Sequence, residues 1–223
     1  MGIGVKVKVW GEYALFSRPE MKVERCSYDV ITPSAARGIL EAIYWHPGMK
    51  WIIDSIKVCA PIKHMNIKRN EVGSVISSNT VLTAAKNESL EGLYLVASND
   101  RQQRSSLVLR DVHYVITAHF EMTESATETD SAAKFASIID RRLTKGQCYY
   151  SPYFGCREFP VNFKKCETAP PCPEELKGTR HLGFMLYDMD YSDPQSIKPM
   201  FFDAKLVDGV LTVPPESSEE VRR

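Results

Sequence analysis

At 223 residues, 43% of them hydrophobic, the chain is long enough for one domain of moderate size or for a domain with a small addition. No segment approaches the roughly 18 consecutive apolar residues that span a membrane, and the first residues lack a signal-peptide hydrophobic stretch, so we expect a cytoplasmic protein with no membrane partner. The net charge of zero hides a basic segment, since residues 133–165 hold seven basic residues against two acidic ones.

The first part of the chain predicts a strand, a helix and a returning strand. Residues 4–10 alternate valine with lysine, which is typical of a half-buried strand. A helix is expected over 33–46, because a threonine or serine at its start can cap it and a proline suits its first turn. Residues 51–63 predict the second strand, and the polar segment 64–92 is expected to be an excursion or a hairpin.

Two aromatic residues, Tyr44 and Trp45, mark the end of that helix before the Pro47-Gly48 stop. On a helix extending to 46, Arg37, Glu41 and Tyr44 recur at i, i+4 and i+7, so they share a stripe apart from the apolar face. Two interpretations are open: these aromatics belong to the core boundary, or the phenol and guanidinium meet a ligand.

The second part predicts a long strand, a helix and a small β-rich segment. On the strand over 107–122, His119 falls on the mixed polar face. A helix is expected over 130–145, ending at Gly146. Prolines exclude long helices after it, and Asp208-Gly209 predicts a hairpin turn. The pattern therefore predicts an α+β fold, with a ferredoxin-like domain over 1–146 and a small antiparallel β domain over 147–223.

Few residue patterns point to a specific chemistry. If the ligand is RNA, its own 2′-hydroxyl can attack the adjacent phosphorus without a metal, given a base, an acid and a nearby cation. Tyr44 and His119 are the candidates for the first two roles, although a hydrogen-bonded boundary histidine is the simpler explanation of His119. The spacing of the cysteines does not suit zinc, and a solvated turn explains the acidic loop at 188–193, so no metal is expected.

Several long blocks of the sequence resemble one known family. These are VWGEYALFSRPEMKVERCSYDVITPSAARGILEAIYWHP, IKRNEV, LRDVHYVITAHFEM and RRLTKGQCYYSPYFGCREFPVNF. Over residues 3–213 the chain is similar to the CRISPR-associated protein 5 of type I-C systems, the guide-RNA-precursor-processing member of the repeat-associated mysterious protein superfamily. The resemblance implies an RNA-recognition-motif-like N-terminal domain and a small C-terminal β domain.

The resemblance also implies an activity and its residues. A member of this family cuts the CRISPR repeat RNA at the 3′ base of its hairpin without a metal or cofactor, leaving a 2′,3′-cyclic phosphate and a 5′-hydroxyl. It then stays on the 5′ handle beside the backbone and large subunits of the surveillance complex, and we expect it to be monomeric alone. The family's catalytic residues carry over to Tyr44 and His119. Phosphate contacts are expected from Arg37, Lys68, Arg69, Arg141, Arg142, Lys145 and Arg157.

The family pattern includes a lysine beside the histidine, where this chain has Thr117-Ala118. Arg37 or Lys145 could supply that cation, or it could be missing. Two other functions stay open: a non-catalytic subunit that only binds the handle, and a general nucleic-acid-binding protein with metal-dependent DNase activity.

Overall fold

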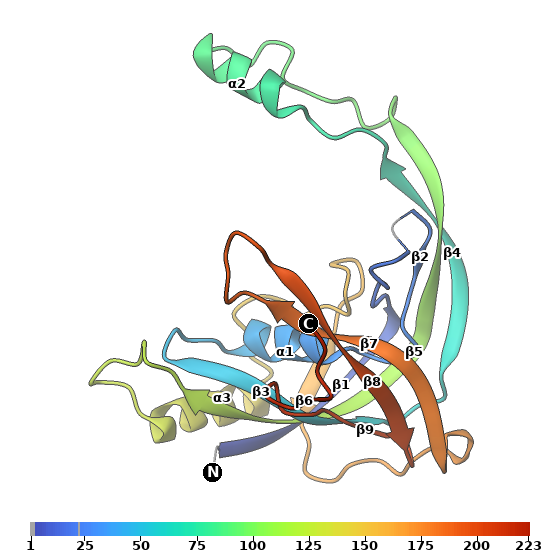
Figure 1. Cartoon of the computed structure of the whole chain (residues 1–223), viewed down its shortest axis with the longest axis vertical. Helices are drawn as coiled ribbons and strands as arrows, with labels where there is room; N and C mark the ends of the chain where they lie inside the picture. Colours follow the sequence, from blue (N-terminus) through green and yellow to red (C-terminus); the bar gives the residue numbers. More distant parts are fainter. Residues whose placement is uncertain (1–2, 22) are drawn as a thin grey trace.

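The computed structural model describes residues 3–21 and 23–223. It is an α+β fold in which a curled sheet carries two helices on one face and a long arm projects from the body (Figure 1). The elements are β1 (Ile3–Ala14), β2 (Arg25–Cys26), α1 (Pro33–Ile43), β3 (Met49–Val58), β4 (Lys63–Val72), α2 (Ser78–Lys86), β5 (Arg101–Met122), α3 (Ala132–Lys145), β6 (Asn162–Lys165), the 3-10 turn η1 (Glu174–Leu176), β7 (Thr179–Asp190), β8 (Lys198–Val207) and β9 (Val210–Thr212).

The main path of the sheet runs β6-β1-β5-β3-β9-β8-β7, while β2 and β4 pair with the distal part of β5. All of these pairings are antiparallel except that of β2 with β5. The chain after Gly146 contributes to both sides of the central strands, because β6 pairs with β1 and β9 pairs with β3. The division of the chain into domains at residue 146 stays a prediction.

The two faces of the central strands differ as the alternation predicts. On β5, Ile116, Ala118 and Phe120 are buried beneath the helices, whereas Thr117 and His119 alternate with them and are half-buried on the opposite face. We call this opposite side of β6, β1, β5 and β3 the open face.

Helix α1 begins as predicted but ends three residues early. The Thr32 hydroxyl accepts a hydrogen bond from the Ala35 amide at 3.2 Å, and Pro33 occupies the first turn. The helix stops at Ile43, and Tyr44 is extended with φ −153° and ψ 127°. The predicted end at 46 and the stripe that included Tyr44 are therefore wrong. A side chain satisfies a carbonyl group at this end of the helix, because the Tyr44 carbonyl accepts a hydrogen bond from the Trp51 indole at 2.9 Å.

Helix α3 and the C-terminal hairpin agree with the sequence signals. The Ser131 hydroxyl caps α3 by accepting from the Lys134 amide, and Gly146 ends it with a left-handed φ of 65°. Asp208 and Gly209 both have positive φ, 49° and 74°, as a tight two-residue turn between β8 and β9 requires.

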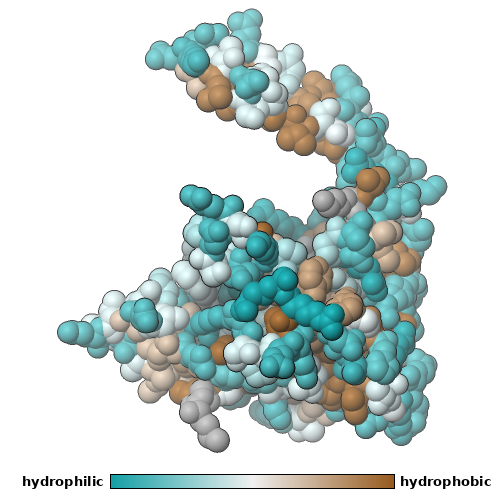
Figure 2. All heavy atoms as spheres, in the orientation of Figure 1, coloured by the Kyte–Doolittle hydropathy of each residue, from teal (hydrophilic) through white to brown (hydrophobic). Residues whose placement is uncertain are grey.

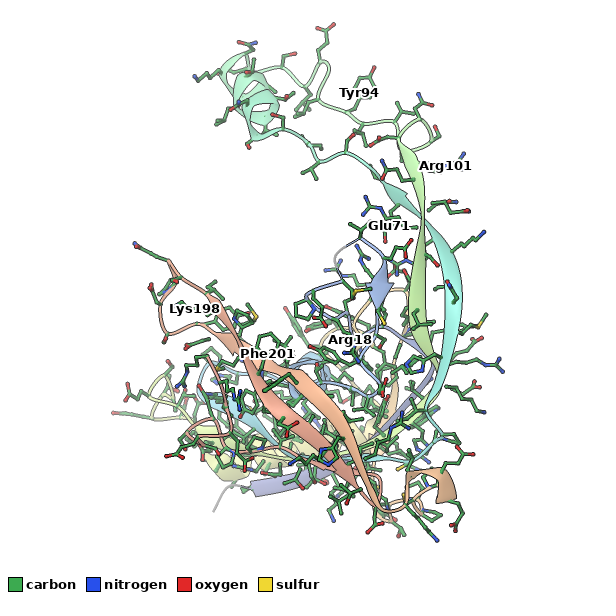
Figure 3. All side chains as sticks on the ribbon, turned by 45° about the vertical axis from the view of Figure 1, so that its right-hand side comes forward. Arg18, Glu71, Tyr94, Arg101, Lys198 and Phe201 are labelled. Carbon is green, nitrogen blue, oxygen red and sulfur yellow. The ribbon has the colours of Figure 1, made fainter. Side chains whose placement is uncertain are left out.

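The segment 64–92 forms most of an arm that was predicted only as an excursion or hairpin. Strand β4 pairs with the distal half of β5, and α2 follows at the tip (Figures 1 and 3). Apolar side chains are exposed along the distal arm (Figure 2), among them Val75, Leu90 and Tyr94 at 92%, 80% and 76% exposure. An apolar surface of this kind favours contact with another macromolecule. None of the helices in the described residues is long and apolar enough to cross a membrane.

Candidate active site

Tyr44 lies at the C-terminal end of α1, on the helix side of the sheet. Its ring centroid is 6.0 Å from that of Phe135 in α3, and the Arg142 guanidinium carbon lies 5.0 Å from the Tyr44 centroid. The same guanidinium donates a hydrogen bond to the Ile43 carbonyl. Helices α1 and α3 therefore fix the phenol beside a cation, and within the described residues no hydrogen bond holds the Tyr44 hydroxyl.

A second histidine, His46, contacts the same phenylalanine as this phenol. Tyr44 is extended, and residues 44–46 form neither helix nor strand. The His46 ring centroid is 4.9 Å from that of Phe135, the ring that Tyr44 also contacts. The His46 Nδ1 atom accepts a hydrogen bond from the Gly48 amide at 3.0 Å and lies 3.9 Å from a carboxylate oxygen of Asp130.

Asp130 and Lys134 complete this group. The Lys134 ammonium lies 3.0 Å from the Asp130 carboxylate, and the Thr127 amide donates to the same carboxylate at 3.1 Å. Hydrogen bonds from Thr127 and Lys134 lower the pKa of Asp130 to about 2, so it is ionised at neutral pH. We call Tyr44, His46, Asp130, Lys134 and Arg142 the Tyr44 cluster.

The protonation state of Tyr44 suits a proton donor. Burial raises the pKa of Tyr44 above the ordinary value of 10.0, and the nearby charges of Arg142 and Lys134 offset part of that rise. The phenol therefore keeps its proton throughout the neutral range, where it can donate that proton to a leaving group.

His119 lies on the other face of the sheet. Its Nδ1 atom is 2.8 Å from the Asp54 carboxylate, and its Nε2 atom is 3.9 Å from that of Glu121. Its neighbour Phe120 points to the helix side, where the ring centroid lies 6.3 Å from that of Phe135. The structure thus places Tyr44 and His119 on opposite faces and does not bring them together.

His119 lines a cavity of about 870 Å³ between α1, β3, β7 and the C-terminal segment. Six carboxylates line it against three basic residues, so its charge does not favour a phosphate. The carboxylates are Glu41, Asp54, Glu121, Asp188, Asp190 and Glu216, and the basic residues are Arg37, Lys50 and Arg223.

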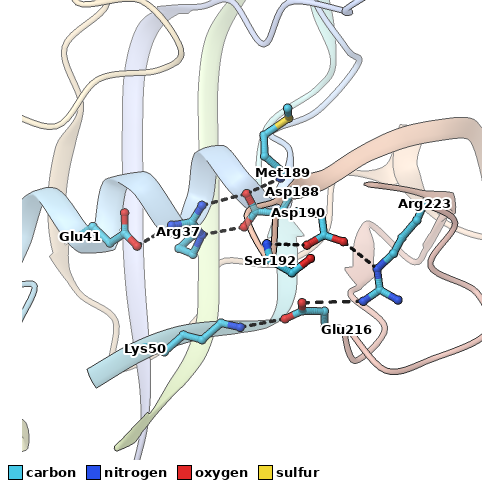
Figure 4. A network of polar contacts seen from close by, with 9 residues as sticks. All are labelled: Arg37, Glu41, Lys50, Asp188, Met189, Asp190, Ser192, Glu216 and Arg223. Atoms are coloured by element: carbon cyan, nitrogen blue, oxygen red, sulfur yellow. Dashed lines mark hydrogen bonds and ion pairs between the residues drawn. The ribbon is translucent and has the colours of Figure 1, made fainter. Parts of the chain in front are cut away.

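Arg37, predicted to bind RNA, is engaged within this cavity (Figure 4). Its guanidinium donates two 2.8 Å hydrogen bonds to Asp188 and one of 2.6 Å to Glu41. Burial alone would lower the pKa of Arg37, but the two carboxylates outweigh it and raise that pKa further above its ordinary value. The ion pair of Arg37 with Asp188 therefore connects α1 with β7.

Of the other basic residues predicted to bind RNA, two contact groups of the protein and four are exposed. Arg69 is held in the arm, at 2.9 Å from Glu71 and 3.7 Å from Glu158, so both of its neighbours compete with a phosphate. Arg142 belongs to the Tyr44 cluster. The remaining four are exposed on the arm, on α3 and on the loop after it, and they are Lys68, Arg141, Lys145 and Arg157.

The sequence prediction missed His46, Asp130 and Lys134. His46 is part of the same IYWHP block as Tyr44, and Lys134 belongs to the basic segment, so both signals were present in the sequence. Over 3–21 and 23–223, no group of three or more histidine, cysteine or acidic side chains is placed to hold a metal ion. The predicted solvated turn at 188–193 is wrong in its first part, because Asp188 and Asp190 lie at the end of β7. Both are engaged, Asp188 with Arg37 and Asp190 with Arg223 at 3.2 Å.

Known proteins resemble this chain over nearly its full length. A protein from Mannheimia succiniciproducens named CRISPR pre-crRNA endoribonuclease Cas5d is 48% identical over 223 residues, 98% of each chain. A protein of the same name from Thermus thermophilus is 39% identical over 238 residues, 98% of this chain and 95% of the relative.

Solved structures share the fold at lower sequence identity. One titled as a CRISPR-associated protein has a TM-score of 0.69 at 23% identity, covering 100% of this chain and 97% of its own. A functionally uncharacterized protein from Streptococcus mutans has a TM-score of 0.70 at 21% identity, covering 100% and 98%. The family model described as CRISPR-associated protein (Cas_Cas5) matches residues 4–214. With the two relatives, this match shows that the chain belongs to the Cas5d family of CRISPR-associated proteins of type I-C systems.

Proposed function

We propose that this protein is an endoribonuclease that cuts precursor guide RNA at the 3′ base of the CRISPR repeat hairpin and then stays on the 5′ handle. The observation that carries the proposal is the 48% identity, over 98% of both chains, to a relative named for this activity. The Tyr44 cluster supports it, because the protonated phenol of the buried Tyr44 lies near the charges of Arg142 and Lys134, and His46 contacts the same Phe135 ring.

These groups suit cleavage by the RNA's own 2′-hydroxyl. For His46 to act as the base, its Nδ1 atom, which accepts from the Gly48 amide in the protein alone, exchanges that amide for the RNA. Nδ1 then accepts the proton of the 2′-hydroxyl, whose oxygen forms a new bond to the adjacent phosphorus. The bond from phosphorus to the 5′-oxygen breaks, and Tyr44 gives its proton to that oxygen. The products are a 2′,3′-cyclic phosphate and a 5′-hydroxyl. We assign stabilisation of the phosphorane to Arg142 and Lys134, because their charges act on Tyr44. No metal takes part in these steps.

The fold supports an RNA-binding role for the N-terminal part of the chain. The order β6-β1-β5-β3, with α1 and α3 on one face, supports a ferredoxin-like arrangement, in which the strand β6 comes from the residues after Gly146. For the apolar distal arm, we assign contacts with neighbouring subunits of the type I-C surveillance complex, namely its backbone and large subunits.

Repeat RNA incubated with the protein in excess EDTA tests this function. We expect one cut at the base of the stem, at a rate unchanged by added magnesium, and no cut in a control RNA whose stem is unpaired by substitutions on one side. Binding of the hairpin without cleavage would instead indicate a subunit that only anchors the handle. Magnesium-dependent cutting that ignores the stem would indicate a general nuclease.

A further inference from the structure

The open face of the sheet, remote from Tyr44, carries a group of lysines that no step above uses. The paired residues Lys164, Lys8, Val115 and Lys57 form one row across β6, β1, β5 and β3. Lys6 lies two residues from Lys8 on the same strand face. Four ammonium groups therefore belong to one side of four adjacent strands.

This arrangement has an electrostatic cost in the protein alone. Lys8 and Lys164 are directly opposite each other on neighbouring strands, where like charges are destabilising. Other lysines of these strands have acidic partners: Lys50 lies 2.8 Å from Glu216, and Lys165 contacts Asp140. In the described residues no carboxylate lies within ion-pair distance of Lys6, Lys8, Lys57 or Lys164, so a bound polyanion would relieve their repulsion.

The four side chains differ in exposure. Lys6 and Lys164 are exposed, and Lys8 and Lys57 are half-buried beside the buried Val115. A half-buried lysine covers apolar surface with its stem and keeps its ammonium group in water.

Aromatic surface lies beside the lysines. Trp10 is 37% exposed, its ring lies 5.6 Å from the Lys8 ammonium, and its centroid is 6.5 Å from that of His113. Burial, with a smaller effect of Lys8, lowers the pKa of His113, so its ring is neutral at pH 7. Lysines beside an exposed indole suit a single-stranded nucleic acid, whose phosphates need cations and whose unpaired bases stack on rings.

We propose that the open face is a second RNA-binding surface, which holds a single-stranded segment adjoining the hairpin through Lys6, Lys8, Lys57 and Lys164, with Trp10 as a stacking platform. This inference rests on the proposed function for the identity of the RNA. It goes beyond that function because the surface lies on the opposite side of the sheet from the Tyr44 cluster.

The double variant Lys8→Thr/Lys164→Thr tests this surface against the matched control Lys63→Thr/Lys198→Thr, which removes two other exposed lysines. Affinity is measured with three RNAs: the hairpin alone, the hairpin with its single-stranded flanks, and a flank alone. We expect the open-face variant to lose about tenfold in affinity for the two flank-containing RNAs. The slope of the logarithm of affinity against the logarithm of salt concentration should fall in magnitude by about 1.4, because two contacts to single-strand phosphates are lost. Affinity for the hairpin alone should match that of the control.

Equal affinities of the two variants for all three RNAs, or equal losses with and without flanks, would overturn the inference. Both variants should still cut the hairpin alone at the wild-type rate, and a wild-type protein that fails to cut would count against the proposed function instead. Thermal unfolding checks the fold. If the double variant does not fold, Lys6→Thr with Lys63→Thr as its control gives the same comparison.

Discussion

Replacement of Tyr44 by phenylalanine should slow cleavage of repeat RNA by about 10²-fold, the usual contribution of a positioned acid or base. The substitution removes only the hydroxyl, which no hydrogen bond within the described residues holds. The ring keeps its contacts with Phe135 and with the Arg142 guanidinium. Single-turnover cleavage with saturating enzyme measures the chemical step directly.

The control for this variant is RNA affinity. Tyr44→Phe preserves both cations of the cluster, so its dissociation constant for the hairpin should stay within about twofold of the wild-type value. A slower cut at unchanged affinity would show that the substitution affects the chemical step alone. The thermal midpoint should also be unchanged. Cleavage at the wild-type rate by a folded Tyr44→Phe variant would remove Tyr44 from the mechanism.

Replacement of His46 by alanine should also reduce single-turnover cleavage, by about 10² to 10⁴-fold, because the 2′-hydroxyl loses its proton acceptor. His119→Ala is the matched control. Both histidines lie near an aspartate and are partly exposed, with side-chain exposures of 36% for His46 and 26% for His119. Only His46 is on the same side of the sheet as Tyr44, so His119→Ala should retain cleavage within a few-fold of wild type.

The two histidine variants also distinguish a catalytic from a structural role. His46 contacts Phe135 and accepts from the Gly48 amide, so its removal could loosen the end of α1. His46→Gln keeps a polar acceptor at this position. This variant should restore activity if His46→Ala only disturbs folding, and it should stay inactive if His46 is catalytic. The reverse pattern, with His119→Ala inactive and His46→Ala active, would move the chemistry to the cavity between α1, β3 and β7.

The end of α1 shows which part of the site the sequence could predict. Its capping threonine and first-turn proline are local signals, and the structure follows them. The helix ends through contacts made by distant residues, since Trp51 bonds the Tyr44 carbonyl and Arg142 bonds that of Ile43. The sequence pattern alone predicted a helix to residue 46, and in such a helix His46 would point away from Tyr44. In the structure both side chains contact the Phe135 ring.

The central strands were more predictable than the arm. Burial on one face of β5 follows the alternation of its residues, and α3 lies between a serine cap and a left-handed glycine. The arm is mostly exposed, with no residue of α2 buried, so its sequence lacks the apolar periodicity that marks an element packed on a core. The separation of His119 from Tyr44 likewise depends on which face each element covers, a tertiary property that neither local pattern contains.

Cleavage of repeat RNA carrying a single 2′-deoxy substitution at the scissile nucleotide tests the central claim most directly, that the RNA supplies its own nucleophile at the Tyr44 cluster. The measurement is single-turnover cleavage in EDTA, with the same substitution at a neighbouring nucleotide as the control RNA. We predict that the scissile-site substitution abolishes the cut while binding is retained, and that the control RNA is cut normally to a 2′,3′-cyclic phosphate and a 5′-hydroxyl. A cut at the unchanged position in the scissile-site 2′-deoxy RNA would contradict the account.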